Sequence, residues 1–296
     1  MIEKMIEKKP KKIHSSLQTA EANKQTTGSK HANVRQQLLV ADIGNTQMVF
    51  GLFEGNDLIT DWRLSSQRQL TSDELAWQLH GMFEQSGQVA TAVAGIMVAS
   101  VVPHLDGPLA DACVRICGKQ PAFVGSSDVK TGMAVDYKNP REVGADRIVN
   151  AIAARERFGA PSIVLDCGTA TTFDLVSPQG HYAGGLIMPG IELALSALCR
   201  RAAKLPEVSI KRSDSLIGRD TTSSLQSGSY WAAVDAMSGL IQRLRREPGY
   251  EFAPVIATGG LISLLIEDLP QIDHHLPHLT LSGLHLLGQR HFKLSD

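Results

Sequence analysis

The sequence contains the same short pattern twice: an apolar stretch ending at an aspartate, then a glycine, hydroxyl-bearing residues and a second apolar stretch. The first copy covers residues 38–53 and the second covers residues 162–176. A turn-forming segment follows each copy, at residues 54–57 and 177–180, so each copy predicts a β-hairpin. A single Asp-x-Gly turn is common in loops. Two copies with matching hairpins indicate an internal duplication and therefore two related lobes.

Each copy combines groups that could hold a phosphate chain and a metal ion. The glycine lets the backbone approach a ligand closely, and the hydroxyl groups supply hydrogen-bond donors. The aspartates, Asp42 and Asp166, would repel phosphate unless a cation lies between them. The duplicated pattern therefore predicts a site for a nucleotide and its metal between the two lobes.

Composition excludes several other classes of protein. In 296 residues, 43% are hydrophobic and 20% are charged, which is enough for the cores of two globular domains. The net charge of −1 provides no basic footprint for nucleic acid, and no apolar run approaches the ~20 residues of a membrane span. The four cysteines form no zinc-binding pattern, so we expect reduced thiols in a cytoplasmic protein that binds neither nucleic acid nor membrane.

The first 36 residues differ from the rest of the chain. They are rich in lysine and contain almost no bulky apolar side chains, so we expect a disordered basic tail. A nucleic-acid or membrane arm is one interpretation; a solvated tail, or a translation start placed too early, is the simpler one. After the tail we predict an N-terminal lobe over residues 37–158 and a C-terminal lobe over residues 159–296.

Apolar strands alternate with helical patterns through both predicted lobes, which indicates mixed sheets covered by helices and an α/β fold. The predicted helices cover residues 75–85, 105–117, 148–157, 191–203, 225–245 and 261–265, and residues 279–287 are expected to form an apolar helix or a strand-to-helix element. Residues 182–190 contain too many glycines for a simple strand, so we expect a close backbone approach to a ligand or helix there, or a plain turn.

Two segments at predicted helix starts have both a structural and a functional interpretation. Asp146 and Arg147 precede a helix, where an aspartate complements the helix dipole and an arginine can simply be exposed. Alternatively, Asp146 accepts a proton from an alcohol and Arg147 pairs with an anionic substrate group. Thr221, before the long helix, is either an N-terminal hydroxyl or a substrate ligand.

Six motifs in order carry a resemblance to a known family. They start at Asp42, Gly144, Asp166, Gly184, Ile217 and Ala257, and read Asp-Ile-Gly-Asn-Thr, Gly-Ala-Asp-Arg, Asp-Cys-Gly-Thr-Ala-Thr-Thr, Gly-Gly-Leu-Ile-Met-Pro-Gly, Ile-Gly-x-x-Thr and Ala-Thr-Gly-Gly. From about residue 37 onward the chain resembles the type III pantothenate kinases. The resemblance implies two ribonuclease-H-like (actin-like ATPase) lobes with nucleotide in the interlobe cleft. It also implies ATP-dependent phosphorylation of pantothenate, the first step of coenzyme A biosynthesis.

The same resemblance implies roles for individual residues. Asp146 corresponds to the proton acceptor, Asp166 to the ligand of a monovalent cation (K⁺ or NH₄⁺), and Thr169 to an ATP contact. The ATP-binding motif falls on Asp42, Ile43, Gly44, Asn45, Thr46, Gln47, Met48 and Val49. The pantothenate-binding residues correspond to Tyr137, Gly144, Ala145, Asp146, Arg147 and Thr221. Relatives look like homodimers with the substrate site bordering the subunit interface, and Mg²⁺ is expected with ATP.

The sequence departs from the family pattern at one point, and two other functions compete with the one that the resemblance implies. Many relatives have a basic residue in the first phosphate motif, whereas this chain has Gln47, Met48 and Val49, so neutralisation of phosphate charge would depend more on metal ions. One rival is a kinase-like accessory regulator of transcription without catalytic activity, which only the basic tail favours. The other is a different superfamily member, such as a sugar kinase or a polyphosphate phosphatase, which would lack Gly-Ala-Asp-Arg with the upstream Tyr137.

Overall fold

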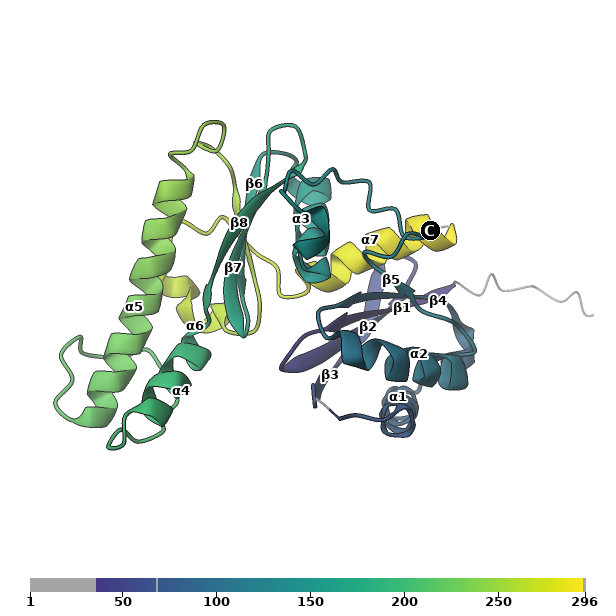
Figure 1. The fold of residues 1–296 in the computed structure, drawn as a ribbon, viewed down its shortest axis with the longest axis horizontal. Helices are drawn as coiled ribbons and strands as arrows, with labels where there is room; N and C mark the ends of the chain where they lie inside the picture. Colours follow the sequence, from purple (N-terminus) through teal and green to yellow (C-terminus); the bar gives the residue numbers. More distant parts are fainter. Residues whose placement is uncertain (1–35, 68, 295–296) are drawn as a thin grey trace, which may run out of the picture. The chain divides into compact units, whose positions relative to one another are not determined.

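The computed structural model describes residues 36–67 and 69–294. The predicted basic tail therefore lies, apart from its last residue, outside the described part of the chain. Across that part, strands and helices alternate as the sequence predicts, and the α/β class is confirmed (Figure 1). None of the helices that the structure describes is long and apolar enough to cross a bilayer.

The first sheet has five strands in the order β3-β2-β1-β4-β5. β1 pairs antiparallel with β2, and β2 pairs antiparallel with β3, while β1–β4 and β4–β5 are parallel. The first Asp-x-Gly segment is the turn between β1 and β2. The strands are β1 (Gln37–Ile43), β2 (Gln47–Glu54), β3 (Asp57–Ser65), β4 (Val93–Ser100) and β5 (Ala122–Phe123).

The second sheet repeats this topology strand for strand. Written in the same direction as the first sheet, its order is β8-β7-β6-β9-β10, so β6 corresponds to β1 and β7 to β2. The β6–β7 and β7–β8 pairs are antiparallel, and the β6–β9 and β9–β10 pairs are parallel. β6 and β7 flank the second Asp-x-Gly segment, so the two motifs occupy equivalent positions and the internal duplication is confirmed. The strands are β6 (Ser162–Cys167), β7 (Ala170–Val176), β8 (Tyr182–Pro189), β9 (Val255–Thr258) and β10 (His274–His275).

Each sheet buries one face under its own helices. Helices α1 (Ser72–Ser86) and α2 (Pro103–Cys117) form a core with the first sheet around Phe50, Leu75 and Leu79. Helices α4 (Ile191–Arg201), α5 (Thr221–Leu244) and α6 (Ile262–Leu265) form the corresponding core on the second sheet. Three short 3₁₀ helices lie at Ala90–Ala92, Pro140–Glu142 and Ile266–Asp268.

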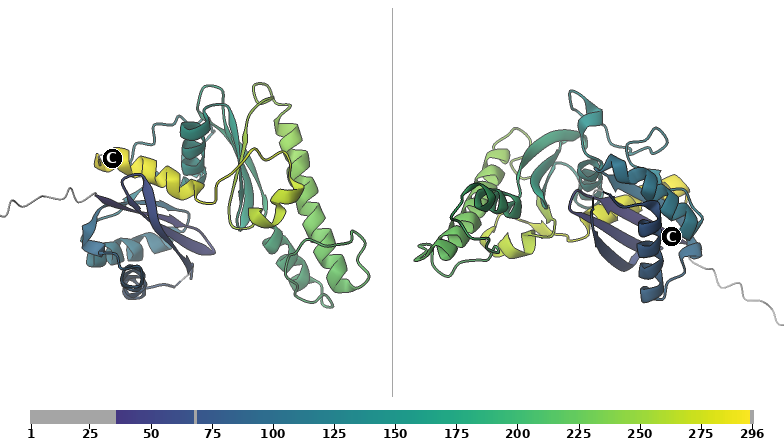
Figure 2. Two further views of the ribbon diagram at one scale, coloured as in Figure 1. Left: turned by 180° about the vertical axis from the view of Figure 1, so that it is seen from behind. Right: turned by 60° about the horizontal axis from the view of Figure 1, so that its bottom comes forward.

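Two helices pack where the two sheets meet. Helix α3 (Ala145–Phe158) covers the face of the second sheet opposite to α5, as both views show (Figures 1 and 2). Helix α7 (Leu279–Phe292) packs on α3 and on β1 and β4. A side chain at Gly283 of α7 would collide with the Val149 carbonyl, so glycine lets these helices approach closely.

The position of α7 bears on the predicted lobes. The sequence predicts a C-terminal lobe over residues 159–296, yet α7 shares a buried cluster with the first sheet that includes Leu38, Val40 and Met97. The boundary near residue 158 stays a prediction, and the last helix of the chain contributes to the core of the first sheet.

The glycine-rich segment 182–190 forms a strand, so the expectation that it is too irregular for one is wrong. β8 pairs with β7 throughout, with a register shift between Leu175 and Val176. Gly184 adopts a φ of 111°, and a side chain at Gly185 would overlap the Phe173 carbonyl oxygen of β7. The glycines therefore serve close approach to a neighbouring strand.

Candidate active site

The two Asp-x-Gly turns lie in contact. In the first turn the Gly44 amide donates to the Gln47 carbonyl at 3.0 Å, and in the second the Gly168 amide donates to the Ala170 carbonyl at 3.0 Å. The Oγ1 atoms of Thr46 and Thr169 are 2.7 Å apart, although 123 positions separate them in the sequence. The duplicated motifs thus bring their hydroxyl groups to one point, as a shared phosphate site requires.

Three carboxylates gather beside these turns. Asp42 is near the end of β1, Asp166 is near the end of β6, and Asp146 is the second residue of α3. Burial raises the pKa of Asp42 well above its usual range, and the charges of Asp146 and Asp166 raise it further. Burial also raises the pKa of Asp166 to about 7, with added repulsion from Asp146. The pKa values of Asp42 and Asp166 are therefore raised by the same two causes, burial and the charge of Asp146.

This donor set fits a cation that is held partly by substrate. Mutual repulsion among the three aspartates would be relieved by positive charge between them. Within residues 36–67 and 69–294, no three Asp, Glu, His or Cys side chains converge tightly enough to form a preformed metal cage. Mg²⁺ in phosphotransferases uses one or two carboxylates together with phosphate oxygens and water, so the arrangement suits that mode.

Asp146 is held at the N-terminus of α3 by its local backbone. Its Oδ1 accepts a hydrogen bond from the Arg147 amide at 2.8 Å, and a side chain at Gly144 would collide with that oxygen. Burial raises the Asp146 pKa, while the Arg147 amide and guanidinium act in the opposite direction. A carboxylate whose proton affinity is raised in this way suits a proton acceptor.

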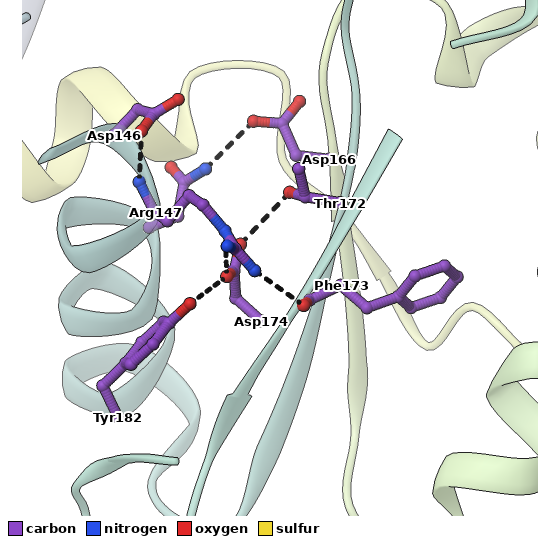
Figure 3. Close-up of polar contacts among 8 residues, drawn as sticks. Asp146, Arg147, Asp166, Thr172, Phe173, Asp174 and Tyr182 are labelled. Atoms are coloured by element: carbon purple, nitrogen blue, oxygen red, sulfur yellow. Dashed lines mark hydrogen bonds and ion pairs between the residues drawn. The ribbon is translucent and has the colours of Figure 1, made fainter. Parts of the chain in front are cut away.

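Arg147 is buried, so the interpretation of it as an exposed arginine is wrong. The residue is 8% exposed, and its Nε donates to Asp174 Oδ1 at 2.7 Å while Nη2 donates to the Phe173 carbonyl at 3.3 Å (Figure 3). Tyr182 Oη also donates to Asp174 Oδ1, at 2.8 Å. The guanidinium is therefore shared between the Asp174 carboxylate and the Phe173 carbonyl, and only Nη1 has no hydrogen-bond partner among residues that the structure describes.

Tyr137 lies next to this buried group and is 41% exposed. The segment before it pairs with the start of β8, where the Asp136 amide donates to the Tyr182 carbonyl at 2.8 Å. The Tyr137 and Tyr182 rings are 6.5 Å apart, and the Arg147 guanidinium carbon lies 5.9 Å from the Tyr182 ring centroid. Tyr137, Arg147 and Asp146 are therefore brought together along one side of α3.

The remaining predicted residues fall into three groups. Ile43 and Met48 are fully buried and pair across β1 and β2, so only their backbones could meet a ligand. Asn45 in the turn and Gln47 at the start of β2 are exposed. Val49 is half-buried in β2, and Ala145 is the first residue of α3.

Thr221 lies apart from the other predicted substrate residues. It is the first residue of α5, which packs on the face of the second sheet opposite to α3 (Figure 1). It lines a cavity of about 550 Å³ together with Gly218, Arg219 and Asp220. Within one chain, Thr221 and Asp146 therefore do not share a site.

Two site residues escaped the sequence analysis. Asp174 is a fully buried carboxylate between Phe173 and Leu175 of β7, and Asn150 is an amide that is 1% exposed on α3. A charged residue within an apolar strand pattern is a signal that could have identified Asp174. Asn150 follows Asp146 by four positions, which puts both residues on one helix face.

Two five-stranded sheets of identical topology, each with an Asp-x-Gly turn between paired antiparallel strands, give the protein a two-lobed actin-like fold. Residues 38–243 match the sequence model of a family described as type III pantothenate kinase. The chain belongs to the type III pantothenate kinase family.

Individual relatives agree with this assignment. A type III pantothenate kinase of Moorella thermoacetica is 44% identical over 253 residues, covering 86% of this chain and 99% of that protein. One from an Anaeromyxobacter species is 45% identical over 254 residues, with 86% and 99% coverage.

Solved structures share the fold at low identity. A Campylobacter jejuni protein described as a conserved Baf family transcriptional activator has a TM-score of 0.51 at 18% identity, covering 84% of this chain and 96% of its own. Component A of (R)-2-hydroxyglutaryl-CoA dehydratase from Acidaminococcus fermentans has a TM-score of 0.50 at 13% identity, covering 87% and 98%. At these identities the likeness concerns the fold alone.

Proposed function

We propose that this chain transfers the γ-phosphoryl group of ATP to the primary hydroxyl of pantothenate. The product is 4′-phosphopantothenate, and the reaction is the first step of coenzyme A biosynthesis. The observation that carries the proposal is the Asp146 carboxylate, which is half-buried at the start of α3 and close enough to Asp42 for its charge to raise the Asp42 pKa. Membership of the type III pantothenate kinase family supports the choice of substrate.

Phosphoryl transfer asks a protein mainly for positioning and charge stabilisation. The amides and hydroxyls of the two turns would hold the phosphate chain, with Thr46 and Thr169 contributing from opposite copies of the motif. Asp146 would hydrogen-bond the pantothenate hydroxyl and accept its proton, a role that contributes about 10²–10⁴-fold in rate. Burial of Asp146 supports this role, because a raised pKa makes the carboxylate a better proton acceptor.

Two kinds of cation fit the carboxylates. Asp42 would hold Mg²⁺ together with phosphate oxygens, and Asp166 would hold K⁺ or NH₄⁺. When bound, these cations neutralise the negative charge of the triphosphate. Since the exposed Gln47 provides no charge where many relatives have a basic residue, this chain would depend strongly on such neutralisation.

At the substrate end, Tyr137 and Arg147 would bound the pantothenate pocket. Because Nε and Nη2 of Arg147 are engaged with Asp174 and Phe173, a substrate carboxylate would meet Nη1 rather than the whole fork. Such a contact would use one N–H group of the guanidinium rather than two. Tyr137 is free to pack on the ligand, since it is exposed beside Gly184.

We further propose a homodimer in which Thr221 of the partner subunit completes the pantothenate site. The separation of Thr221 from Asp146 within one chain supports this arrangement, because a second copy could supply the missing hydroxyl. Large exposed apolar side chains near α4 and α5 support an interface there. They are Ile187, Leu193, Leu198, Leu216 and Ile217.

Mixing two inactive variants tests whether subunits share a site. Asp146→Asn and Thr221→Val should each lose activity alone. When their subunits are exchanged, the heterodimer should regain one intact site, and random pairing gives about one quarter of wild-type activity. No recovery, despite heterodimers seen by native mass spectrometry, would contradict a shared site.

An ADP-release assay tests the proposed reaction against its rivals. We expect ADP release with pantothenate, but not with glucose, glycerol or polyphosphate, and stimulation by potassium. Salt-sensitive DNA binding with no pantothenate-dependent ADP release would instead favour the transcriptional regulator.

The four cysteines are free and buried, which supports the proposed cytoplasmic location.

A further inference from the structure

Asn150 bridges three elements beside the candidate active site. It lies on α3 and is 1% exposed. Its Nδ2 donates to Asp166 Oδ2 at 3.0 Å, and its Oδ1 accepts from Thr280 Oγ1 at 2.8 Å. Thr280 is the second residue of α7, so this amide connects the end of β6 to the helix that packs on the first sheet.

The chemistry of the groups fixes the orientation of the amide. When Asp166 is ionised, as it would be with a cation bound, its carboxylate only accepts hydrogen bonds, so the NH₂ group of Asn150 faces it. The Asn150 oxygen then faces Thr280, whose hydroxyl donates to it. Both ends of a fully buried amide are satisfied, and a rotated amide would lose both contacts.

This bridge determines which oxygen of Asp166 is available. Oδ2 is engaged by Asn150, whereas Oδ1 lies against the glycine turns. A Cβ atom at Gly259 would be 2.6 Å from Oδ1, and one at Gly168 would be 3.8 Å from it. Oδ1 is therefore the Asp166 oxygen that faces the phosphate-binding turn.

We infer that Asn150 and Thr280 are positioning residues for the monovalent-cation site. They hold Asp166 in the rotation that directs Oδ1 at the Gly168 turn, and so set the potassium concentration at which the protein binds nucleotide. This inference rests on the proposed role of Asp166 as a cation ligand. Neither residue touches substrate; Thr280 acts through Asn150, and Asn150 acts through Asp166. Outer-shell partners of this kind typically change metal affinity by about 10–100-fold.

Four variants separate positioning from packing. Thr280→Val removes the donating hydroxyl at nearly constant shape, and Thr280→Ser keeps the hydroxyl while removing a methyl group. Asn150→Ala removes the bridge. Ser282→Ala is the matched control, because Ser282 is on the same helix but donates to the His278 carbonyl at 2.9 Å, away from Asp166.

The measurement is binding of a non-hydrolysable ATP analogue by calorimetry at increasing KCl, with choline chloride keeping ionic strength constant. Thr280→Val should raise the potassium midpoint by roughly 2- to 10-fold, as expected for loss of one hydrogen bond. Asn150→Ala should raise it by about 10-fold or more. Thr280→Ser and Ser282→Ala should retain the wild-type midpoint, and urea denaturation should confirm that every variant is folded.

Potassium midpoints equal to wild type in folded Asn150→Ala and Thr280→Val would overturn the inference, even if both variants were less stable. Wild-type protein that binds the analogue equally in potassium and choline would overturn it as well. The proposed reaction is judged separately, by pantothenate-dependent ADP release from the wild-type enzyme. Loss of that activity contradicts the proposed function, while the calorimetric comparison still decides the role of the bridge.

Discussion

Replacing Asp174 by asparagine tests whether the buried ion pair under the substrate site is correctly described. Asp174 is fully buried and accepts hydrogen bonds from Arg147 Nε at 2.7 Å, Tyr182 Oη at 2.8 Å and Thr172 Oγ1 at 3.2 Å. Asparagine keeps the shape and can keep neutral hydrogen bonds. It removes the charge that compensates the Arg147 guanidinium.

The magnitude follows from two opposing effects. Removing one partner of a buried pair typically costs about 3–5 kcal/mol, because the other charge is left uncompensated. Burial already raises the pKa of Asp174 to about 6, so removing this carboxylate also relieves part of its own desolvation. We therefore expect the free energy of unfolding to fall by roughly 2–4 kcal/mol at pH 8.

Urea denaturation of the nucleotide-free protein provides the assay. Asp136→Asn is the matched control, because Asp136 pairs with His181 at 3.0 Å on the surface, and its loss should cost less than ~1 kcal/mol. The double variant Arg147→Met/Asp174→Asn should lose about 1–3 kcal/mol less than the sum of the single losses. An Asp174→Asn protein within about 1 kcal/mol of wild type, with additive behaviour in the double variant, would refute the buried pair.

Two further perturbations test the neighbourhood. The pKa of Asp166 is about 7 in the folded protein and ~3.9 when unfolded, so the folded state binds the extra proton and stability falls as pH rises from ~4 to ~7. Asp166→Asn should therefore be more stable than wild type by about 1–3 kcal/mol at pH 8 without metal or nucleotide, and this difference should disappear near pH ~4. Urea denaturation at both pH values measures it. A variant whose stability at pH 8 is equal to or lower than that of wild type would contradict the raised pKa of Asp166. Gly185→Ala should destabilise by about 1–3 kcal/mol in the same assay, because its methyl group would overlap the Phe173 carbonyl. Gly81→Ala, in an open position of α1, should instead stabilise by about 0.5–1 kcal/mol, and a similar result at both glycines would contradict the close approach of β8 to β7.

Local patterns were sufficient to predict most of the fold. The repeated apolar–Asp-x-Gly–apolar pattern predicted both hairpins, and the capping box at Thr71 and Glu74 marks the start of α1. The glycines of β8 misled the prediction because their cause is not local: Gly185 is needed by a carbonyl on β7 that pairing brings alongside. The contacts of α7 with β1 were also beyond local reasoning, since they join the two ends of the described chain.

The candidate site was predictable where one motif supplies the residue and its surroundings. Asp42, Asp146 and Asp166 could be selected because each lies near the end of a strand or the start of a helix, two residues from a glycine. The partner of Arg147 could not be selected, because Asp174 is 27 residues away and contacts Arg147 only when α3 packs on β7. Thr221 showed the opposite problem: its motif suggests a substrate contact, but its position on α5 is separated from Asp146 by the sheet.

The most direct test of the central claim is the comparison of Asp146→Asn with wild type in ATP-dependent phosphorylation of pantothenate. Mass spectrometry would follow the phosphorylated product, and calorimetry would follow binding of a non-hydrolysable ATP analogue. We predict that kcat falls by about 10²–10⁴-fold while affinity for the analogue changes little, because Asp146 acts on the hydroxyl and not on the nucleotide. A variant that binds the analogue and phosphorylates pantothenate at a near-wild-type rate would contradict the account.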